Sequence, residues 1–354
     1  MGRGDVMTSK ERWEAVVNRQ IPDRLPNFYR STDEFTQKLM KHFGCADYKE
    51  LFSKLHIDEQ AYVWPRYAGP PIPDREDFYG CRYRDIKYAT GVYRECCFNP
   101  LADCETIKEI DSVIDWPAAD LYDYSGIKDQ LNENSHLPII IGGWEPYLVY
   151  KHLRGEERGY TDMIEYPEIV HHIMGKLFEF HFGILTRTLE MCGEGDILLC
   201  AMGEDLGSQT SLMYSPKHIR EYFFPYHKKF FAPLRERKIK IQWHTDGSAR
   251  EILPELIELG TEILDPVQWR CAGMEREGLK KDFGDKLIFH GAVDNQYTLP
   301  FGSVEEVREE VRENFEIFGR NSGYILGPCH NIQPVGPVEN VVAMYEICYN
   351  ECRY

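Results

Sequence analysis

The sequence predicts a parallel α/β fold, a (β/α)8 barrel with an irregular N-terminal extension. Six short apolar runs alternate with helical stretches after residue 130, as in a buried parallel sheet. Two further strands are expected near residues 25–29 and 55–63, which brings the total to eight. We expect one barrel domain over residues 1–354, with the extension and first elements in 1–130 and the regular units in 131–354.

A doubly wound sheet is the rival architecture. It is disfavoured because the glycine motif of dinucleotide-binding folds is missing: Gly193-Glu-Gly195 lacks the third glycine. No phosphate-binding loop motif occurs either. Each of the six apolar runs has the length of a buried strand and is bounded by Gly, Pro, Asp or Ser. They span residues 137–143, 197–203, 239–244, 262–267, 287–293 and 324–327.

The starts of several helices are marked by capping residues. A Ser or Thr followed by Glu three residues later forms a capping box, and proline favours a first helical turn. These signals are Thr8 with Glu11, Ser215 with Pro216, Ser303 with Glu306, and Pro337. Between residues 64 and 117 the sequence is rich in aromatic residues, Pro and Gly, which predicts loops, short strands and a hairpin.

Composition excludes several classes of function. The 354 residues carry 41 Lys and Arg against 58 Asp and Glu, a net charge of −17, so we expect no nucleic-acid partner. No apolar run is long enough to span a membrane, and the first residues do not resemble a signal peptide, so a cytoplasmic location is expected. The 11 cysteines are odd in number and lack metal-finger or disulfide spacing, so most are expected to be buried thiols.

Polar side chains follow most of the predicted strands. In a parallel barrel the active site lies at the carboxyl ends of the strands, so these side chains are the candidate site. We expect four catalytic residues and eight that bind the substrate. The catalytic candidates are His244, Glu204, Asp246 and His330. The substrate-binding candidates are Trp144, Tyr147, Asp205, Gln209, Gln268, His290, Asn331 and Gln333.

Two carboxylate patterns stand out. His244 and Asp246 lie two residues apart, so in extended backbone both face one metal ion or one substrate; alternatively Asp246 only caps the next helix. Glu204 and Asp205 form a pair in which repulsion raises one pKa, which suits a general acid if both are buried. The alternative is a solvated loop in which Asp205 forms a turn.

The dipeptide Cys329-His330 follows the last strand. It offers a thiolate or imidazole ligand, or a proton donor. The alternative is a buried thiol beside a histidine that only bonds a neighbouring loop.

Together these motifs resemble the uroporphyrinogen decarboxylase superfamily, a TIM-barrel family that includes corrinoid-dependent methyltransferases. The resemblance runs nearly end to end, and the motifs occur in the family's order. The matching segments are residues 8–12 with 22–26, 203–209 with 214–216, 244–247, 265–268, and 327–334 with 337–340.

Within the superfamily, the resemblance favours the methyltransferase branch. Decarboxylases carry an Arg-Gln-Ala-Gly-Arg-Tyr segment that binds substrate carboxylates, whereas residues 26–31 here offer only Arg30. Thiol-methylating members hold zinc with a His-x-Cys pair and a later Cys. Here His244 takes the His position, Asp246 replaces the first Cys, and Cys329 or His330 takes the later place. The resemblance therefore implies a candidate zinc site formed by His244, Asp246 and Cys329. The loss of a soft thiolate fits an oxygen or nitrogen substrate better.

The resemblance implies an enzyme that moves a methyl group between a small methylated substrate, such as a methoxy-aromatic compound, and a corrinoid protein. The corrinoid is expected on that partner, because no cobalamin-binding motif occurs here. Two alternatives stay open. One is decarboxylation of uroporphyrinogen or another polycarboxylate, and the other is a non-catalytic tetrapyrrole-binding protein.

Overall fold

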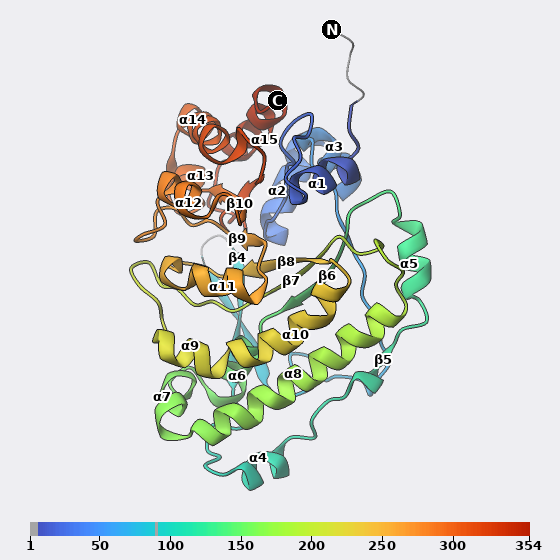
Figure 1. The fold of residues 1–354 in the computed structure, drawn as a ribbon, viewed down its shortest axis with the longest axis vertical. Helices are drawn as coiled ribbons and strands as arrows, with labels where there is room; N and C mark the ends of the chain where they lie inside the picture. The colour runs from blue at the N-terminus through green and yellow to red at the C-terminus, as the bar shows by residue number, and fades with distance from the viewer. Residues whose placement is uncertain (1–5, 89–90) are drawn as a thin grey trace.

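A curled parallel sheet forms the centre of the molecule. The computed structural model describes residues 6–88 and 91–354 (Figure 1). Within them, seven strands lie in the order β1-β6-β7-β8-β9-β10-β11, and every neighbouring pair is parallel. The strands are β1 (Ala61–Tyr62), β6 (Ile139–Trp144), β7 (Leu199–Gly203), β8 (Lys240–His244), β9 (Ile263–Asp265), β10 (Ile288–Val293) and β11 (Tyr324–Pro328). The six apolar runs are therefore confirmed as strands.

The two strands expected in the N-terminal region are much reduced. Residues 25–29 form only a single parallel bridge, between Asn27 and Leu326 of β11. The carbonyl of Asn27 also accepts a bond from the Asp58 N–H at 2.9 Å, just ahead of β1. Pro26 has no N–H to donate, which limits ladder formation there. Of the second predicted strand, residues 55–63, only β1 is present, and its first predicted residue, Leu55, ends helix α3 (Tyr48–Leu55). The sheet is thus seven-stranded rather than the predicted eight.

The N-terminal part of the chain contains further short strands and helices. The predicted hairpin is present as β3 (Arg82–Tyr88) and β4 (Gly91–Phe98), which pair antiparallel. A second small sheet joins β2 to β5. The remaining N-terminal elements are α1 (Ser9–Val17), α2 (Asp33–Phe43), β2 (Arg66–Tyr67), α4 (Ile107–Val113), η1 (Ala119–Leu121), β5 (Tyr122–Asp123) and α5 (Ile127–Glu133).

Helices cover the outside of the parallel sheet, and α8 and α10 run side by side across it (Figure 1). The capping boxes at Thr8 and Ser303 are confirmed, and Ser215 is an N-cap followed by Pro216 as predicted. Pro337, predicted to start the last helix, is its N-cap, and the helix begins at Val338. The helices are α6 (Pro146–Arg154), α7 (Arg158–Glu165), α8 (Pro167–Glu190), α9 (Pro216–Tyr222), α10 (Phe224–Glu236), η2 (Arg250–Ile252), α11 (Leu253–Leu259), α12 (Arg276–Phe283), α13 (Thr298–Phe301), α14 (Val304–Asn314), η3 (Phe315–Gly319) and α15 (Val338–Glu351). In the described residues, none is long and apolar enough to cross a membrane.

Helix α1 closes the amino-terminal end of the sheet. Trp13 and Val16 of α1 are fully buried and pack against residues near the start of successive strands, among them Leu199 and Ile263. The Trp13 indole also donates to the carbonyl of Asp58 at 3.2 Å, which satisfies its N–H. Because this end is filled, the carboxyl ends of the strands are the face left for chemistry.

Candidate functional site

A cavity of about 270 Å³ lies at the carboxyl ends of the strands. Its walls come from β1, β6, β7, β8 and β9 and from segments flanking the sheet. Of the predicted site residues, Trp144, His244, His330 and Asn331 line it. The full lining is Arg30, Tyr62, Gly143, Trp144, Glu145, Ala201, Met202, Gly203, Gln242, His244, Asp265, His330 and Asn331.

Asp265, the last residue of β9, is the charged centre of the cavity. Its carboxylate accepts hydrogen bonds from Arg30 at 2.8 Å and from His244 Nδ1 at 3.1 Å, and His290 Nδ1 lies 2.8 Å from its other oxygen. Burial alone would raise the pKa of Asp265, but the positive charge of Arg30 and the contacts with His290 and His244 hold that pKa well below its usual range. Asp265 is therefore an anion that orients its neighbours.

His244 ends β8 and receives its orientation from Asp265. Burial would lower the pKa of the imidazole, but the hydrogen bond and charge of Asp265 outweigh it and raise the pKa to about 9. His244 Nδ1 is hydrogen-bonded to Asp265, while Nε2 lies 3.8 Å from Asp205 Oδ1. In the absence of metal, His244 carries a proton at neutral pH that Nε2 can deliver.

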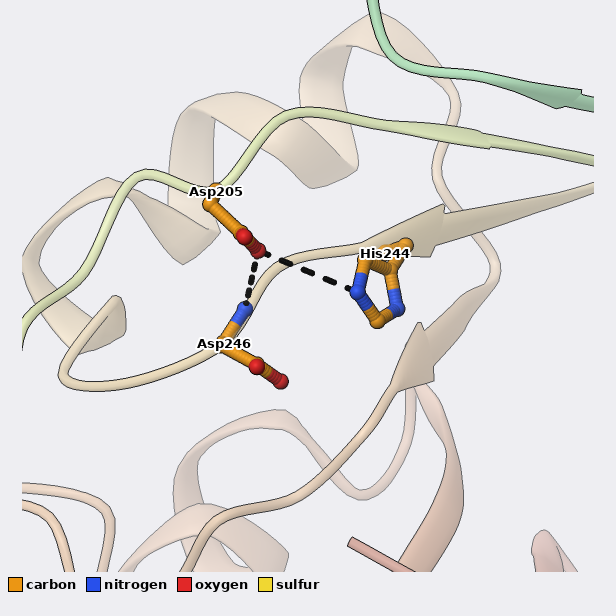
Figure 2. A group of neighbouring side chains, drawn as sticks. All are labelled: Asp205, His244 and Asp246. Carbon is orange, nitrogen blue, oxygen red and sulfur yellow. Dashed lines mark hydrogen bonds and ion pairs between the residues drawn. The ribbon is translucent and has the colours of Figure 1, made fainter. Parts of the chain in front are cut away.

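Asp205 and Asp246 lie beside His244 (Figure 2). The Asp246 backbone N–H donates to Asp205 Oδ1 at 3.0 Å, which joins the loops after β7 and β8. Burial raises the pKa of the Asp246 carboxyl to about 6. His330 Nε2 lies 3.9 Å from Asp246, and burial lowers the pKa of His330. The structure thus brings together three of the predicted catalytic side chains, His244, Asp246 and His330.

A divalent metal fits the group formed by Asp205, His244 and Asp246. One ligand atom from each lies within 4.8 Å of the others. Asp246 Oδ1 is buried without a hydrogen-bond partner among the described residues, and Asp265 fixes the His244 ring as a carboxylate fixes many zinc-bound histidines. Nitrogen and carboxylate oxygen are ligands that zinc accepts.

Cys329 does not belong to this group, contrary to the predicted ligand set. Its thiol donates to the Val267 carbonyl at 3.1 Å. Burial raises the pKa of that thiol well above its usual range, and the Cys329 sulfur is not among the ligand atoms that lie within 4.8 Å of one another. Asp205, predicted only to bind substrate, takes its place beside His244 and Asp246.

Glu204 is set apart from the cavity that it was predicted to serve. It is buried, and one carboxyl oxygen accepts the Tyr147 N–H at 2.9 Å, at the start of α6. The other oxygen lies 3.8 Å from Nε2 of the buried His227. The pKa of Glu204 is raised well above its usual range, chiefly by burial and not by the predicted repulsion from a buried Asp205, which is exposed. Yet Asp205 faces His244 while Glu204 faces the helices, so the two do not share a site.

The chain is similar to known proteins in sequence and in fold. Residues 101–350, well over half of the chain, match the family model described as uroporphyrinogen decarboxylase (URO-D). This chain belongs to the uroporphyrinogen decarboxylase family. Membership was predicted from the motifs and is confirmed.

One protein similar in sequence and one similar in structure extend this comparison. The chain is 23% identical over 176 residues to the uroporphyrinogen decarboxylase of Hydrogenovibrio crunogenus, covering 49% of this chain and 46% of that protein, so it spans about half of that relative's length. A solved methyltransferase from Methanosarcina mazei superposes with a TM-score of 0.67 at 18% identity, over 97% of this chain and 98% of that one. At that identity the likeness establishes the shared fold.

The remaining five substrate-binding candidates contact other parts of the described chain and do not line the cavity. The Tyr147 hydroxyl donates to the Gly159 carbonyl at 2.6 Å, and Gln268 Oε1 accepts the Gly247 N–H at 2.8 Å. The other three are similarly placed: Gln209 Oε1 lies 3.4 Å from the Cys271 thiol, Gln333 accepts the Tyr88 hydroxyl at 3.2 Å, and His290 is buried against Asp265.

Five polar residues of the cavity lining were not predicted as site residues: Arg30, Tyr62, Glu145, Gln242 and Asp265. Asp265 is the final residue of an apolar run, so it was counted within the strand. Glu145 follows the strand end directly, and burial raises the pKa of its carboxyl. Arg30 and Tyr62 lie in the irregular N-terminal region, where only tertiary structure brings them to the cavity.

Proposed function

We propose that this chain transfers a methyl group between a small methylated substrate, such as a methoxy-aromatic compound, and a corrinoid carried by a partner protein. The observation that carries the proposal is the charge of the cavity. Among its described lining residues, Arg30 is the one arginine or lysine, and it already pairs with Asp265. His244, the other cation of the lining, also pairs with Asp265, and Glu145 adds a further carboxyl group. Such a cavity offers no unpaired cation to a polycarboxylate tetrapyrrole and admits a small neutral ether.

The size and walls of the cavity agree with a small substrate. The volume of about 270 Å³ lies just below the range of about 300–1,000 Å³ that is usual for drug-sized ligands, so it suits a smaller substrate. The Trp144 indole is packed against Trp64, with ring centroids 5.2 Å apart, and forms one wall. Tyr62 contributes a second aromatic ring to the lining. Aromatic walls suit a flat ring that carries a methoxy group.

The side chains of this site supply a proton to the leaving oxygen. When the methyl carbon–oxygen bond breaks, the electron pair stays on the oxygen, which then takes the proton from His244 Nε2. Asp265 holds Nδ1, so the ring keeps its orientation as the proton leaves. The corrinoid, when its partner protein presents it, supplies the methyl acceptor.

A bound zinc ion would be an alternative aid to the same leaving oxygen. Asp205, His244 and Asp246 would hold it, and it would supply Lewis acidity at the leaving group. His244 would then be neutral, with Nε2 toward the metal and Nδ1–H toward Asp265. The two mechanisms differ in the protonation of His244. As a proton donor it carries a proton on both ring nitrogens, and with zinc bound it would carry one only on Nδ1.

Metal analysis of the purified protein beside His244→Ala distinguishes these versions. About one zinc per chain, lost in the variant, supports Lewis acidity, and no metal in either supports proton donation. His172→Ala is the matched control, since that imidazole pairs with Asp111 on the surface at 2.7 Å. The proposal fails if no methoxylated or methylamine donor methylates a corrinoid protein's cobalt, above all if uroporphyrinogen is instead decarboxylated.

A further inference from the structure

A second cavity, larger than the one at the strand ends, lies on the outer face of the helical layer. It has a volume of about 750 Å³ and runs between α8 and α10, which lie side by side in Figure 1. We call it the α8–α10 groove. None of its lining residues belongs to the strand-end cavity, so the two sites are separate. Its volume falls within the range of small-molecule pockets.

Aromatic rings form the floor and walls of the groove. Phe178 and Phe182 come from α8, and Tyr226 and Phe230 come from α10. Phe178 stacks on Tyr226 with centroids 5.2 Å apart, and Phe182 meets Phe230 at 6.1 Å. Phe178 and Phe230 are buried, so the aromatic surface open to a ligand ring comes from the half-buried Phe182 and Tyr226.

Gly175 keeps the groove open. It lies inside α8, where glycine costs about 1 kcal/mol relative to alanine. A Cβ added at Gly175 would meet no atom within 4 Å, so packing within the described chain does not require a glycine there. Gly183, on the same helix, is different, because its Cβ would lie 2.9 Å from the Cβ of Ala119. The missing side chain at Gly175 therefore provides space rather than a close helix contact.

Two lysines give the groove a positive rim in a chain whose net charge is −17. Among the described residues, the lysine ion pairs are those of Lys151 and Lys240, so neither Lys176 nor Lys229 is neutralised by a carboxylate within 4.0 Å. Lys229 Nζ instead lies 5.5 Å from the ring centroid of Phe182. Glu179 is the one carboxylate of the lining.

We propose that the α8–α10 groove binds a small aromatic anion. The ring of the ligand would lie among the phenylalanine side chains, in the space left by Gly175, and its carboxylate would meet Lys176 and Lys229. Apolar burial favours the ring, and charge-assisted hydrogen bonds favour the anion. This inference does not depend on the activity proposed above.

Calorimetric titration with naphthoate, and with naphthamide as its neutral counterpart, tests the proposal. We expect naphthoate to bind the wild-type chain and naphthamide to bind about tenfold more weakly. Gly175→Leu should weaken naphthoate binding at least about tenfold by filling the groove, without a lower Tm, because the added atoms meet open space.

Neutralising a lysine or the glutamate of the lining should change the naphthoate affinity in opposite directions. Lys229→Gln should weaken naphthoate binding several-fold at low salt, and Glu179→Gln should strengthen it. Lys228→Gln is the matched control, since Lys228 is exposed and is not part of the lining. His244→Ala should still bind naphthoate, which separates the groove from the strand-end cavity. The proposal is overturned if naphthoate does not bind at about 1 mM, or if Gly175→Leu binds it as well as the wild type.

Discussion

Arg30 and Asp265 are 235 residues apart in sequence, yet the guanidinium donates to the carboxylate at 2.8 Å. The same oxygen, Oδ2, accepts the hydrogen bond from His244 Nδ1. Asp265 Oδ2 thus links Arg30, in the N-terminal extension, to His244, the proposed proton donor. Because the positive charge of Arg30 lowers the pKa of His244 while Asp265 raises it, the three groups form one electrostatic unit.

Arg30→Met should destabilise the fold. Asp265 is buried and would lose its permanent positive partner, which costs about 3 kcal/mol of unfolding free energy, at the lower end for a broken buried pair because two histidines remain in contact. Arg66→Met is the control: Arg66 pairs with Asp123 on the surface, where the expected loss is below about 1 kcal/mol. Urea unfolding of both variants measures the difference. Equal stability would mean that the histidines alone hold Asp265.

The stability of the metal-free protein should depend on the charge of His244. Its folded-state pKa, about 9, lies above the ordinary value of 6.5, so the ion pair with Asp265 contributes stability that is fully present below pH 6.5 and is lost as the pH rises through 9. His244→Gln should lack this dependence. Urea unfolding of both proteins across this range, together with NMR titration of the imidazole, measures it. An imidazole that titrates near 6.5 would contradict the assigned role of Asp265.

The strands and helix starts were predictable because their signals are local. The apolar runs and the capping boxes at Thr8 and Ser303 lie within a few residues of the structure that they specify. The reduced strand at residues 25–29 was not predictable in this way. Its backbone bonds go to Leu326 and Asp58, far along the chain, so only the folded structure decides how many ladder bonds form.

Which strand-end carboxylate enters the cavity was also hidden from the sequence. Both Glu145 and Glu204 follow apolar runs. The register between β6 and β7 shifts at Gly142–Trp144, where Gly142 and Gly143 have φ of 105° and 94°. A Cβ at Gly142 would lie 2.0 Å from the Ala201 carbonyl oxygen, so glycine is required there. Such a bulge redirects the following side chains, and Glu145 lines the cavity while Glu204 does not.

Glu204→Gln should retain activity, and Glu145→Gln should change it. Burial raises the pKa of Glu204 and lowers the pKa of His227 to about 4, so burial favours the uncharged form of both groups and an amide replaces the carboxyl with little loss. Glu204→Ala leaves the Tyr147 N–H without its partner and should cost about 2 kcal/mol. Methyl-transfer rates and urea unfolding of the variants test this. A Glu204→Gln variant that is stable but inactive would restore Glu204 as the general acid.

Zinc content should respond to Asp205 and not to Cys329. Asp205→Asn removes a charged oxygen from the group that includes His244 and Asp246, so its zinc affinity should fall about 10-fold or more. Cys329→Ala removes a protonated thiol that bonds only the Val267 carbonyl, so zinc content should equal that of the wild type. Metal analysis after dialysis against a graded chelator measures both. Loss of zinc in Cys329→Ala alone would place the thiol in the ligand set after all, and it would require the loop after β11 to turn Cys329 toward His244 when the metal binds.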